Sequence, residues 1–374
     1  MAGIYTHIPF CKQTCSYCNF HFSTSLKLKQ QLLNALAMEI ELSSGYLPNK
    51  NIDSIYLGGG TPSLLSETEL NTIFDHLARH YSWNEEAEIT IEANPDDLSD
   101  AHLKSLSNSP INRLSIGIQS FHEQELRFMN RAHSSAEASA CIQKALDHGF
   151  ENLSADLIFG LPGSTLESWN SNLETATAFQ IDHLSCYSLT VEEKTALAHR
   201  VKTDQVAMPE QENAAAQFLH TIKFLEEVGF EHYEISNYAK PGKRAQHNSS
   251  YWSGELYLGL GPSAHSFNGK ARRWNVANNP QYIKEIGGNQ IPYEEETLSA
   301  VDCANEVIMT SLRTMEGLDV EAFEMRFSKN WVAKILENAQ IFLNEQQIKL
   351  VNNRLFLTNK GKLIADRIAA SMFV

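Results

Sequence analysis

Three cysteines near the start of the chain have the spacing of a metal-binding loop. Cys11, Cys15 and Cys18 follow the pattern C-x-x-x-C-x-x-C within one short segment. Three thiolates are one fewer than the four that usually hold a 4Fe-4S cluster, so one iron would keep an open position for an outside molecule. The spacing therefore predicts a 4Fe-4S cluster with three cysteine ligands and room for chemistry at the remaining iron.

The same cysteines also allow a zinc knuckle, in which closely spaced thiols and a fourth ligand close the site. His7 or His21 could supply that fourth ligand. Structural zinc sites tend to take their ligands in two pairs, whereas all three thiols lie here in one loop flanked by aromatic residues such as Tyr5 and Phe10. This difference favours the iron-sulfur interpretation.

The cysteine loop resembles that of the radical S-adenosylmethionine superfamily, in which an aromatic residue such as Tyr17 precedes the last cysteine. Four further segments resemble motifs of that superfamily and follow in the same order: GGGTP at 58–62, EANP at 92–95, GIQSF at 117–121 and DLIFGLP at 156–162. Within the superfamily, the chain is most similar to the group of oxygen-independent coproporphyrinogen III oxidase, and there to the HemW-like haem chaperones.

Two features separate the oxidase from the chaperones. The oxidase carries a fourth cysteine two positions after the third, where this chain has Phe20, and an extension ahead of the loop, where this chain has ten residues. The resemblance therefore implies a protein that binds haem and transfers it to acceptor haemoproteins, using a 4Fe-4S cluster and S-adenosylmethionine. Two alternatives are a coproporphyrinogen III oxidase (dehydrogenase) of porphyrin biosynthesis and a radical modifier of RNA or another macromolecule. Whether S-adenosylmethionine is cleaved stays open.

The resemblance also implies which residues contact the cofactor. The glycine turn at 58–62 lacks the lysine of a nucleotide-binding P-loop and would hold the methionyl ammonium. Arg131 marks a position that helps to bind a second cofactor molecule in the oxidase, so one or two molecules remain possible; an exposed arginine there could also form only a surface ion pair. The implied contacts are Tyr5, Tyr17, Gly59, Gly60, Thr61, Glu92, Gln119, Arg131, Asp156 and Thr190.

A second motif, HNSSYW at 247–252, is the candidate haem-binding segment. His247 could bind haem iron through a ring nitrogen while Tyr251 and Trp252 cover the macrocycle, because imidazole is a common axial ligand. A histidine in a folded loop more often forms hydrogen bonds only. His265 is a second and weaker candidate.

Short apolar runs at 4–6, 52–57, 89–92, 114–118, 153–158 and 184–189 alternate with helical patterns. This β/α repetition predicts a parallel sheet in a partial (β/α)6 barrel, the fold that the superfamily resemblance also implies. Each motif follows a strand, at the carboxyl edge where such folds place their sites. We expect a barrel domain at 1–235 and a smaller C-terminal α+β, winged-helix-like domain at 236–374.

Composition limits the partners. The 374 residues carry a net charge of -15, which argues against a general nucleic-acid surface. No apolar run is long enough to span a bilayer and no signal pattern is present, which predicts a cytoplasmic protein without a transmembrane segment and leaves peripheral contact with a membrane open. The implied partners are haem, acceptor haemoproteins and a reduced flavodoxin or ferredoxin-type electron donor.

Overall fold

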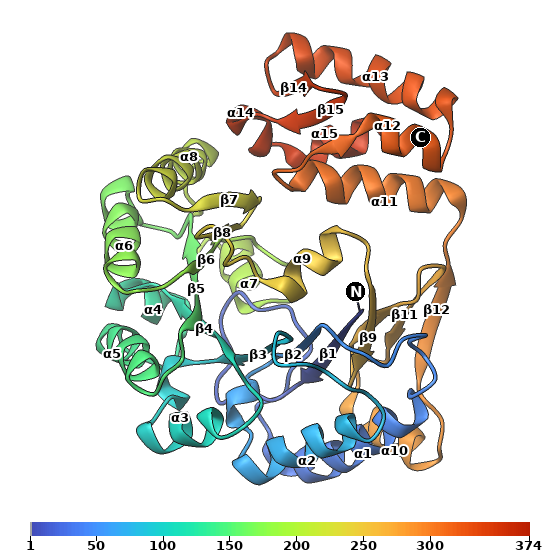
Figure 1. The fold of residues 1–374 in the computed structure, drawn as a ribbon. Coiled ribbons are helices and arrows are strands. Elements are labelled where there is room, and N and C mark those ends of the chain that lie inside the picture. Colours follow the sequence, from blue (N-terminus) through green and yellow to red (C-terminus); the bar gives the residue numbers. More distant parts are fainter. Residues whose placement is uncertain (1) are drawn as a thin grey trace.

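Six parallel strands form the centre of the molecule. The computed structural model describes residues 2–374. Neighbouring strands from β1 to β6 pair in parallel and in sequence order, which confirms the predicted partial barrel (Figure 1). Their bounds are β1 (Ala2–Ile8), β2 (Ser54–Gly59), β3 (Glu88–Ala93), β4 (Arg113–Gln119), β5 (Asn152–Phe159) and β6 (His183–Ser188).

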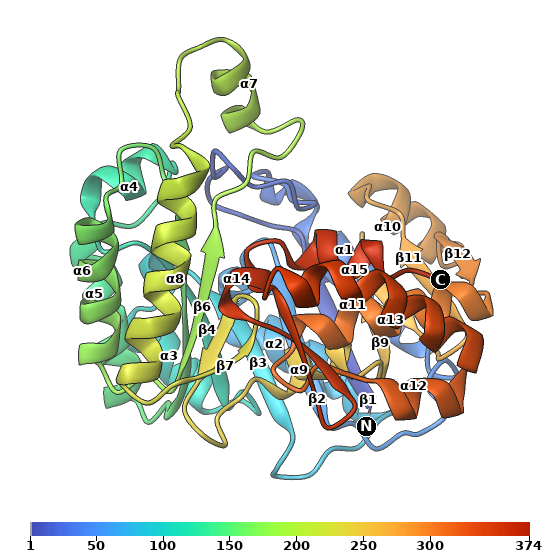
Figure 2. The same cartoon turned by 90° about the horizontal axis from the view of Figure 1, so that it is seen from above.

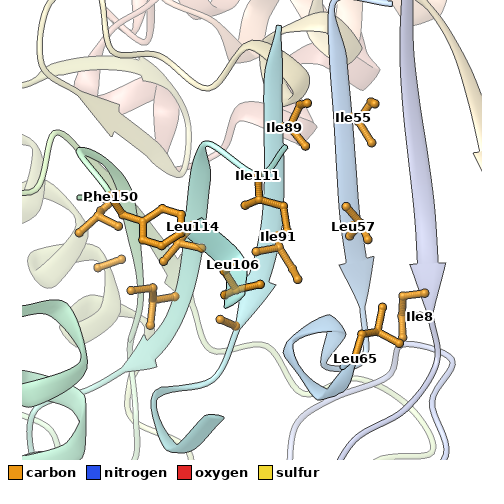
Figure 3. Close-up of a cluster of buried hydrophobic side chains, with 14 of the residues drawn as sticks. Ile8, Ile55, Leu57, Leu65, Ile89, Ile91, Leu106, Ile111, Leu114 and Phe150 are labelled. Atoms are coloured by element: carbon orange, nitrogen blue, oxygen red, sulfur yellow. The ribbon is translucent and has the colours of Figure 1, made fainter. Parts of the chain in front are cut away.

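Helices cover the outer face of this sheet, where every second strand residue is apolar. Figure 3 shows part of the resulting core, in which Leu57 of β2 and Ile91 of β3 pack with Leu106 of a covering helix. Several of these helices begin at a capping box, as at Ser66 with Glu69, which satisfies free backbone amides at the helix start. The helices are α1 (Lys29–Leu42), α2 (Glu67–Ala78), α3 (Asp100–Ser107), α4 (Glu123–Phe128), α5 (Ser135–Asp147), α6 (Leu166–Ala178) and α8 (Gln211–Glu227).

Both edges of the six-stranded sheet are extended by later strands. At one edge β9 runs parallel to β1 and is followed by antiparallel strands; at the other edge β8 runs antiparallel to β6 and pairs with β7. The segment 231–239, which follows the last apolar run predicted as a strand, contributes both β7 and β8. The added strands are β7 (Glu231–Glu234), β8 (Asn237–Ala239), β9 (Leu256–Leu260), β10 (His265–Phe267), β11 (Ala271–Asn275) and β12 (Tyr293–Thr297).

Three helices belong to these extensions and to the barrel rim. Helix α7 (Ala196–Lys202) projects from the body in the view of Figure 2, whereas α9 (Gln246–Trp252) lies on the concave side of the sheet (Figure 1). Helix α10 (Asn279–Gly287) packs on α1. The carboxylate of Glu39 in α1 links the barrel to the strands and helix beyond β1. It is fully buried and accepts hydrogen bonds from Tyr282 Oη (2.6 Å), Asn275 Nδ2 (2.6 Å) and the amide of Gly261 (2.7 Å).

The C-terminal part forms a second hydrophobic core from residues 304 to 372. Its three-stranded antiparallel sheet has the order β13-β15-β14, and the sequence of helix, strand, two helices and two strands has the winged-helix-like arrangement expected from the sequence. The elements are α11 (Ala300–Arg313), β13 (Leu318–Asp319), α12 (Val320–Arg326), α13 (Lys329–Asn344), β14 (Ile348–Val351), β15 (Arg354–Leu357), α14 (Asn359–Lys362) and α15 (Ala365–Ser371).

The boundary between the two predicted domains stays a prediction. The large sheet and its core continue through β12, which ends at Thr297, and the second core starts at Ala304. The two parts contact each other through ion pairs, such as Arg313 Nη2 with Glu234 (3.0 Å), and through Lys362 Nζ, which lies 2.8 Å from Nδ1 of His232. Within residues 2–374, no helix is long and apolar enough to cross a membrane.

Candidate functional site

A cavity of about 500 Å³ opens at the carboxyl ends of the parallel strands. It lies where parallel α/β folds place their sites, because several strand ends and the loops after them converge there. Twelve of the fourteen residues predicted to bind metal or cofactor line it: Cys11, Cys15, Cys18, Tyr17, Gly59, Gly60, Thr61, Glu92, Gln119, Arg131, Asp156 and Thr190.

The cysteine loop leaves the end of β1 and lies across one side of the cavity. Its thiols are free and half-buried, and the Nη1 group of Arg131 lies 3.3 Å from Sγ of Cys15. Burial raises the pKa of the Cys11 thiol to about 11, although a hydrogen bond with Thr61 lowers it in part. A metal bound to such a thiol displaces its proton, so this pKa does not prevent ligation.

The donor set fits a 4Fe-4S cluster better than a zinc ion. Thiolates are the ligands that iron-sulfur clusters prefer, and the three thiols share one cavity wall. The two histidines considered as a fourth zinc ligand are engaged elsewhere. Nε2 of His7 lies 2.9 Å from the carbonyl oxygen of His21, and Nε2 of His21 lies 2.7 Å from Oδ1 of Asn279. Nδ1 of His7 also lies 3.0 Å from Oη of Tyr5, so both of its ring nitrogens are engaged and ligation of zinc by His7 would break an existing contact.

The glycine turn after β2 packs directly behind the cysteine loop. A Cβ on Gly60 would lie 2.6 Å from the carbonyl oxygen of Phe10, next to Cys11, so a side chain there would push the loop away. Gly59 has φ of +113° and lies against the ring of His7, which again excludes a side chain. The two glycines thus set how closely the turn approaches the loop, and they leave bare backbone facing the cavity.

Two half-buried carboxylates, Glu92 and Asp156, lie at the inner end of the cavity. Glu92 accepts hydrogen bonds from Tyr56 Oη (2.9 Å) and from the amide of Gly59 (3.0 Å). Burial raises the pKa of Glu92 to about 7, and the nearby Asp156 adds to that rise against the two hydrogen bonds. Burial also raises the pKa of Asp156, against hydrogen bonds from Ser185 and Ser115. A carboxylate of this kind is stabilised as an anion by a cationic ligand.

Arg131 connects several walls of the cavity. Besides contacting Cys15, its Nη2 group donates to the carbonyl oxygen of Gly117 (2.8 Å) and to Oδ1 of Asn94 (2.5 Å). The surface ion pair considered for this arginine is therefore not its role, because the guanidinium is held inside the site. Gln119 has φ of +63° at an irregularity in the pairing of β4 with β5. Such strained backbone is concentrated at ligand sites.

Tyr5 and His247 are the two predicted cofactor residues that the structure does not place on the cavity. Tyr5 Oη lies 3.0 Å from Nδ1 of His7, and its ring stacks on Tyr56. His247 is 1 % exposed; its Nδ1 lies 2.8 Å from Oγ of Ser54 and its Nε2 lies 2.9 Å from Oη of Tyr251. Both ring nitrogens of His247 are thus engaged inside the barrel, and a role as haem ligand stays a prediction that requires these bonds to break.

Several cavity residues were not predicted from the sequence. Asn94 belongs to the EANP motif, so its position after β3 was a usable signal, and it also donates from Nδ2 to Thr61 Oγ1 (3.1 Å). Ser115 and Tyr187 also line the cavity. They share a side of the sheet with the predicted carboxylates, because Ser115 pairs with Glu92 and Tyr187 lies two residues after Ser185, the partner of Asp156.

Comparisons with known proteins agree with this site. The Radical SAM superfamily profile matches residues 5–176, and the HemN C-terminal domain profile matches residues 298–364. The crystal structure of coproporphyrinogen III oxidase HemN from Escherichia coli, at 24% identity, covers 100% of this chain and 90% of its own with a TM-score of 0.87, which shows the shared fold.

Two curated relatives extend along nearly the whole chain. The "Heme chaperone HemW" of Bacillus subtilis is 33% identical over 371 residues, covering 98% of each chain. The protein of the same name from Mycobacterium tuberculosis is 32% identical over 375 residues, covering 99% of this chain and 94% of the relative. With identity at this level over the full length, the chain belongs to the HemW family of the radical SAM superfamily.

Proposed function

We propose that this chain is a haem chaperone, which binds haem and passes it to acceptor haemoproteins in the cytoplasm. Full-length relatives bear the name of that activity. The observation that carries the proposal over an oxidase is Phe20, which lines the cavity mouth and is 68% exposed. The oxidase pattern has a fourth cysteine at this position, and a phenylalanine cannot supply its thiol.

In this proposal the cavity holds a 4Fe-4S cluster on Cys11, Cys15 and Cys18 together with S-adenosylmethionine. The bound pair supplies radical chemistry or a binding signal when the cluster is reduced. Arg131 places a positive charge 3.3 Å from Sγ of Cys15, next to the negative charge that a thiolate-ligated cluster would bring. Glu92 offers its carboxylate to the cationic part of S-adenosylmethionine. The loop between Cys11 and Cys15 is exposed, which gives a reduced flavodoxin or ferredoxin access to the site.

The size of the cavity supports a second location for haem. A volume of about 500 Å³ is that of a site for one drug-sized ligand. S-adenosylmethionine and the cluster would fill it, so a tetrapyrrole needs a different surface of the protein. In an oxidase the porphyrinogen would have to reach the same cavity.

One experiment tests the chaperone function against the oxidase function. The protein is reconstituted with iron and sulfide without oxygen and titrated with haem, with and without the cluster, and then mixed with an apo haemoprotein. We expect stoichiometric haem binding and transfer to the acceptor. In a parallel reaction with coproporphyrinogen III and S-adenosylmethionine, we expect unchanged substrate, and a vinyl-bearing product would contradict the proposal.

A further inference from the structure

The strands that extend the sheet beyond β1 carry an aromatic face on the concave side of the barrel. We define this aromatic face as Tyr257, His265, Phe267 and Trp274. His265 lies opposite Trp274 in the antiparallel pair of β10 and β11, and Phe267 lies opposite both Tyr257 and Arg272, so these side chains share one side of the sheet. The ring centroids of His265 and Trp274 are 6.0 Å apart and their planes differ by 28°. Tyr257 contacts Tyr251 of α9, which places the face on the concave side.

The backbone at His265 is fixed by the turn before it. A Cβ on Gly259 would lie 1.9 Å from the carbonyl oxygen of His265, so β10 can cross β9 here only because this residue is glycine. Gly261 and Ser263 both have positive φ, at +92° and +65°. For Ser263 this conformation is unfavourable and is maintained by its surroundings. The turn therefore holds the imidazole of His265 in a defined place.

The ring of His265 is available, unlike that of His247. His265 is exposed, and within residues 2–374 neither of its ring nitrogens has a hydrogen-bond partner. His247 is buried, and both of its ring nitrogens lie within hydrogen-bond distance of hydroxyl groups. A neutral imidazole with a free nitrogen is the usual axial ligand of haem iron. Of the two histidines, His265 can accept a metal without a change in the fold.

Helix α11 of the C-terminal core passes over the same region. Glu306 binds Arg272 (2.7 Å), and Arg313, two turns further along the helix, lies over the ring of Trp252 at 5.1 Å. Met309 is spaced between these two contact points on the same helix face and is 40% exposed. The helix thus presents an apolar side chain between two contacts with the barrel.

Two buried donors in this region lack an acceptor. Within residues 2–374, Nε of Arg272 and Nε1 of Trp252 are buried and have no hydrogen-bond partner. Buried donors are normally satisfied, so each indicates a missing acceptor such as a water or a ligand carboxylate. Arg272 and Trp274 are two residues apart on β11, which separates them by about 6.8 Å. Because His265 lies opposite Trp274, Arg272 lies on the same side of the sheet as the imidazole, displaced from it by one such step along the strand.

We infer that haem binds on the aromatic face, with His265 as the axial ligand of the iron and Arg272 and Trp252 as donors to the propionates. Trp274 acts as a positioning residue, because its ring is stacked on the imidazole and fixes its plane. Phe267, Tyr257 and Met309 supply the apolar contacts that a porphyrin requires. This inference rests on the proposed function, which states only that the chain binds haem.

The test is a haem titration of the full-length chain and its His265→Ala variant, followed by the Soret band. We expect His265→Ala to weaken haem affinity by about tenfold or more and to shift the band, because the iron loses a ligand. Added imidazole should restore the wild-type band in this variant. His199→Ala, which removes an exposed histidine of α7, is the matched control and should bind haem as the wild type does.

A third variant separates the two histidines. We expect His247→Ala to keep the wild-type Soret band and to melt at a lower temperature, because it removes a buried ring from the barrel interior. If His265→Ala binds haem with wild-type affinity and spectrum, the inference fails while the proposed function stands. If the wild-type protein itself binds no haem, the proposed function fails.

Discussion

The half-buried carboxylate of Glu92 should make the barrel less stable as the pH rises. The pKa of Glu92 is raised from 4.5 to about 7 in the folded chain. A folded-state pKa above the unfolded value means that the folded chain binds more protons in this interval, so its stability is fully present below pH 4.5 and is lost as the pH rises through 7. The full loss is about 3 kcal/mol, of which about 2.5 kcal/mol falls between about pH 5 and about pH 8.5.

The Glu92→Gln variant isolates this effect. An amide oxygen can accept from only one of the two donors, Tyr56 Oη or the Gly59 amide, and the amide nitrogen faces the other. This mismatch costs about 1 to 3 kcal/mol at every pH, whereas the ionisation penalty disappears. The difference in unfolding free energy between wild type and variant should therefore change by about 2.5 kcal/mol over that pH range, in favour of the variant at high pH.

The assay is urea unfolding of the metal-free, reduced protein, followed by circular dichroism at a series of pH values. Glu86→Gln is the matched control, because Glu86 is exposed only two residues ahead of the same strand. Its difference from wild type should be constant with pH. A difference curve for Glu92→Gln that is also flat would refute the reasoning, since the carboxylate would then ionise in the folded chain at no cost.

Three further predictions concern the cluster, the sheet extension and the C-terminal contact. Serine in place of Cys11, Cys15 or Cys18 should lower the iron retained after anaerobic reconstitution below about four atoms per chain. The control Cys303→Ser, outside the loop, should retain the full amount of iron. A full amount of iron in Cys11→Ser would exclude Cys11 as a ligand. Glu39→Ala should lower the unfolding free energy by about 3 kcal/mol, because three buried donors lose their acceptor, while the exposed Glu41→Ala should be nearly neutral in the same urea titration. Burial and Lys362 lower the pKa of His232 from 6.5 to about 3, so the stability that the neutral ring contributes is present above pH 6.5 and is lost on acidification. The variant His232→Gln should therefore lose about 3 kcal/mol less unfolding free energy than the wild type between about pH 7 and about pH 4. Equal acid sensitivity of the two proteins would contradict this prediction.

Local pattern was sufficient to predict the six parallel strands and the C-terminal elements. The apolar run at 89–92 lies inside β3, and the run at 153–158 lies inside β5. The short strands β7 and β8 were missed because their sequence, EHYEISNYA, has no apolar alternation. The pairing of β9 with β1 was also missed, because periodicity carries no information about partners that are far apart in the sequence.

The site could be predicted from motifs to the extent that strand ends define it. Cys11 follows β1 and Glu92 is the last residue but one of β3, and the parallel sheet brings these ends together. Asp156 lies inside β5 and lines the same cavity from there. Tyr5 and His247 do not line the cavity, and a motif in the sequence could not show this. Both face the inside of the barrel, but they lie further from its open end, and depth along the barrel axis is decided by strand register and by the docking of α9.

The position of β1 between β2 and β9 has a consequence for biosynthesis. Residues 2–6 pair with residues 256–260, so one edge of β1 has no partner until that later segment has left the ribosome. At typical rates of translation this interval is on the order of ten seconds or more. During that time the nascent chain exposes an unpaired strand edge, which is prone to aggregation, directly ahead of the three thiols. The pairing of β9 with β1 is therefore a late step in the folding of the chain during synthesis.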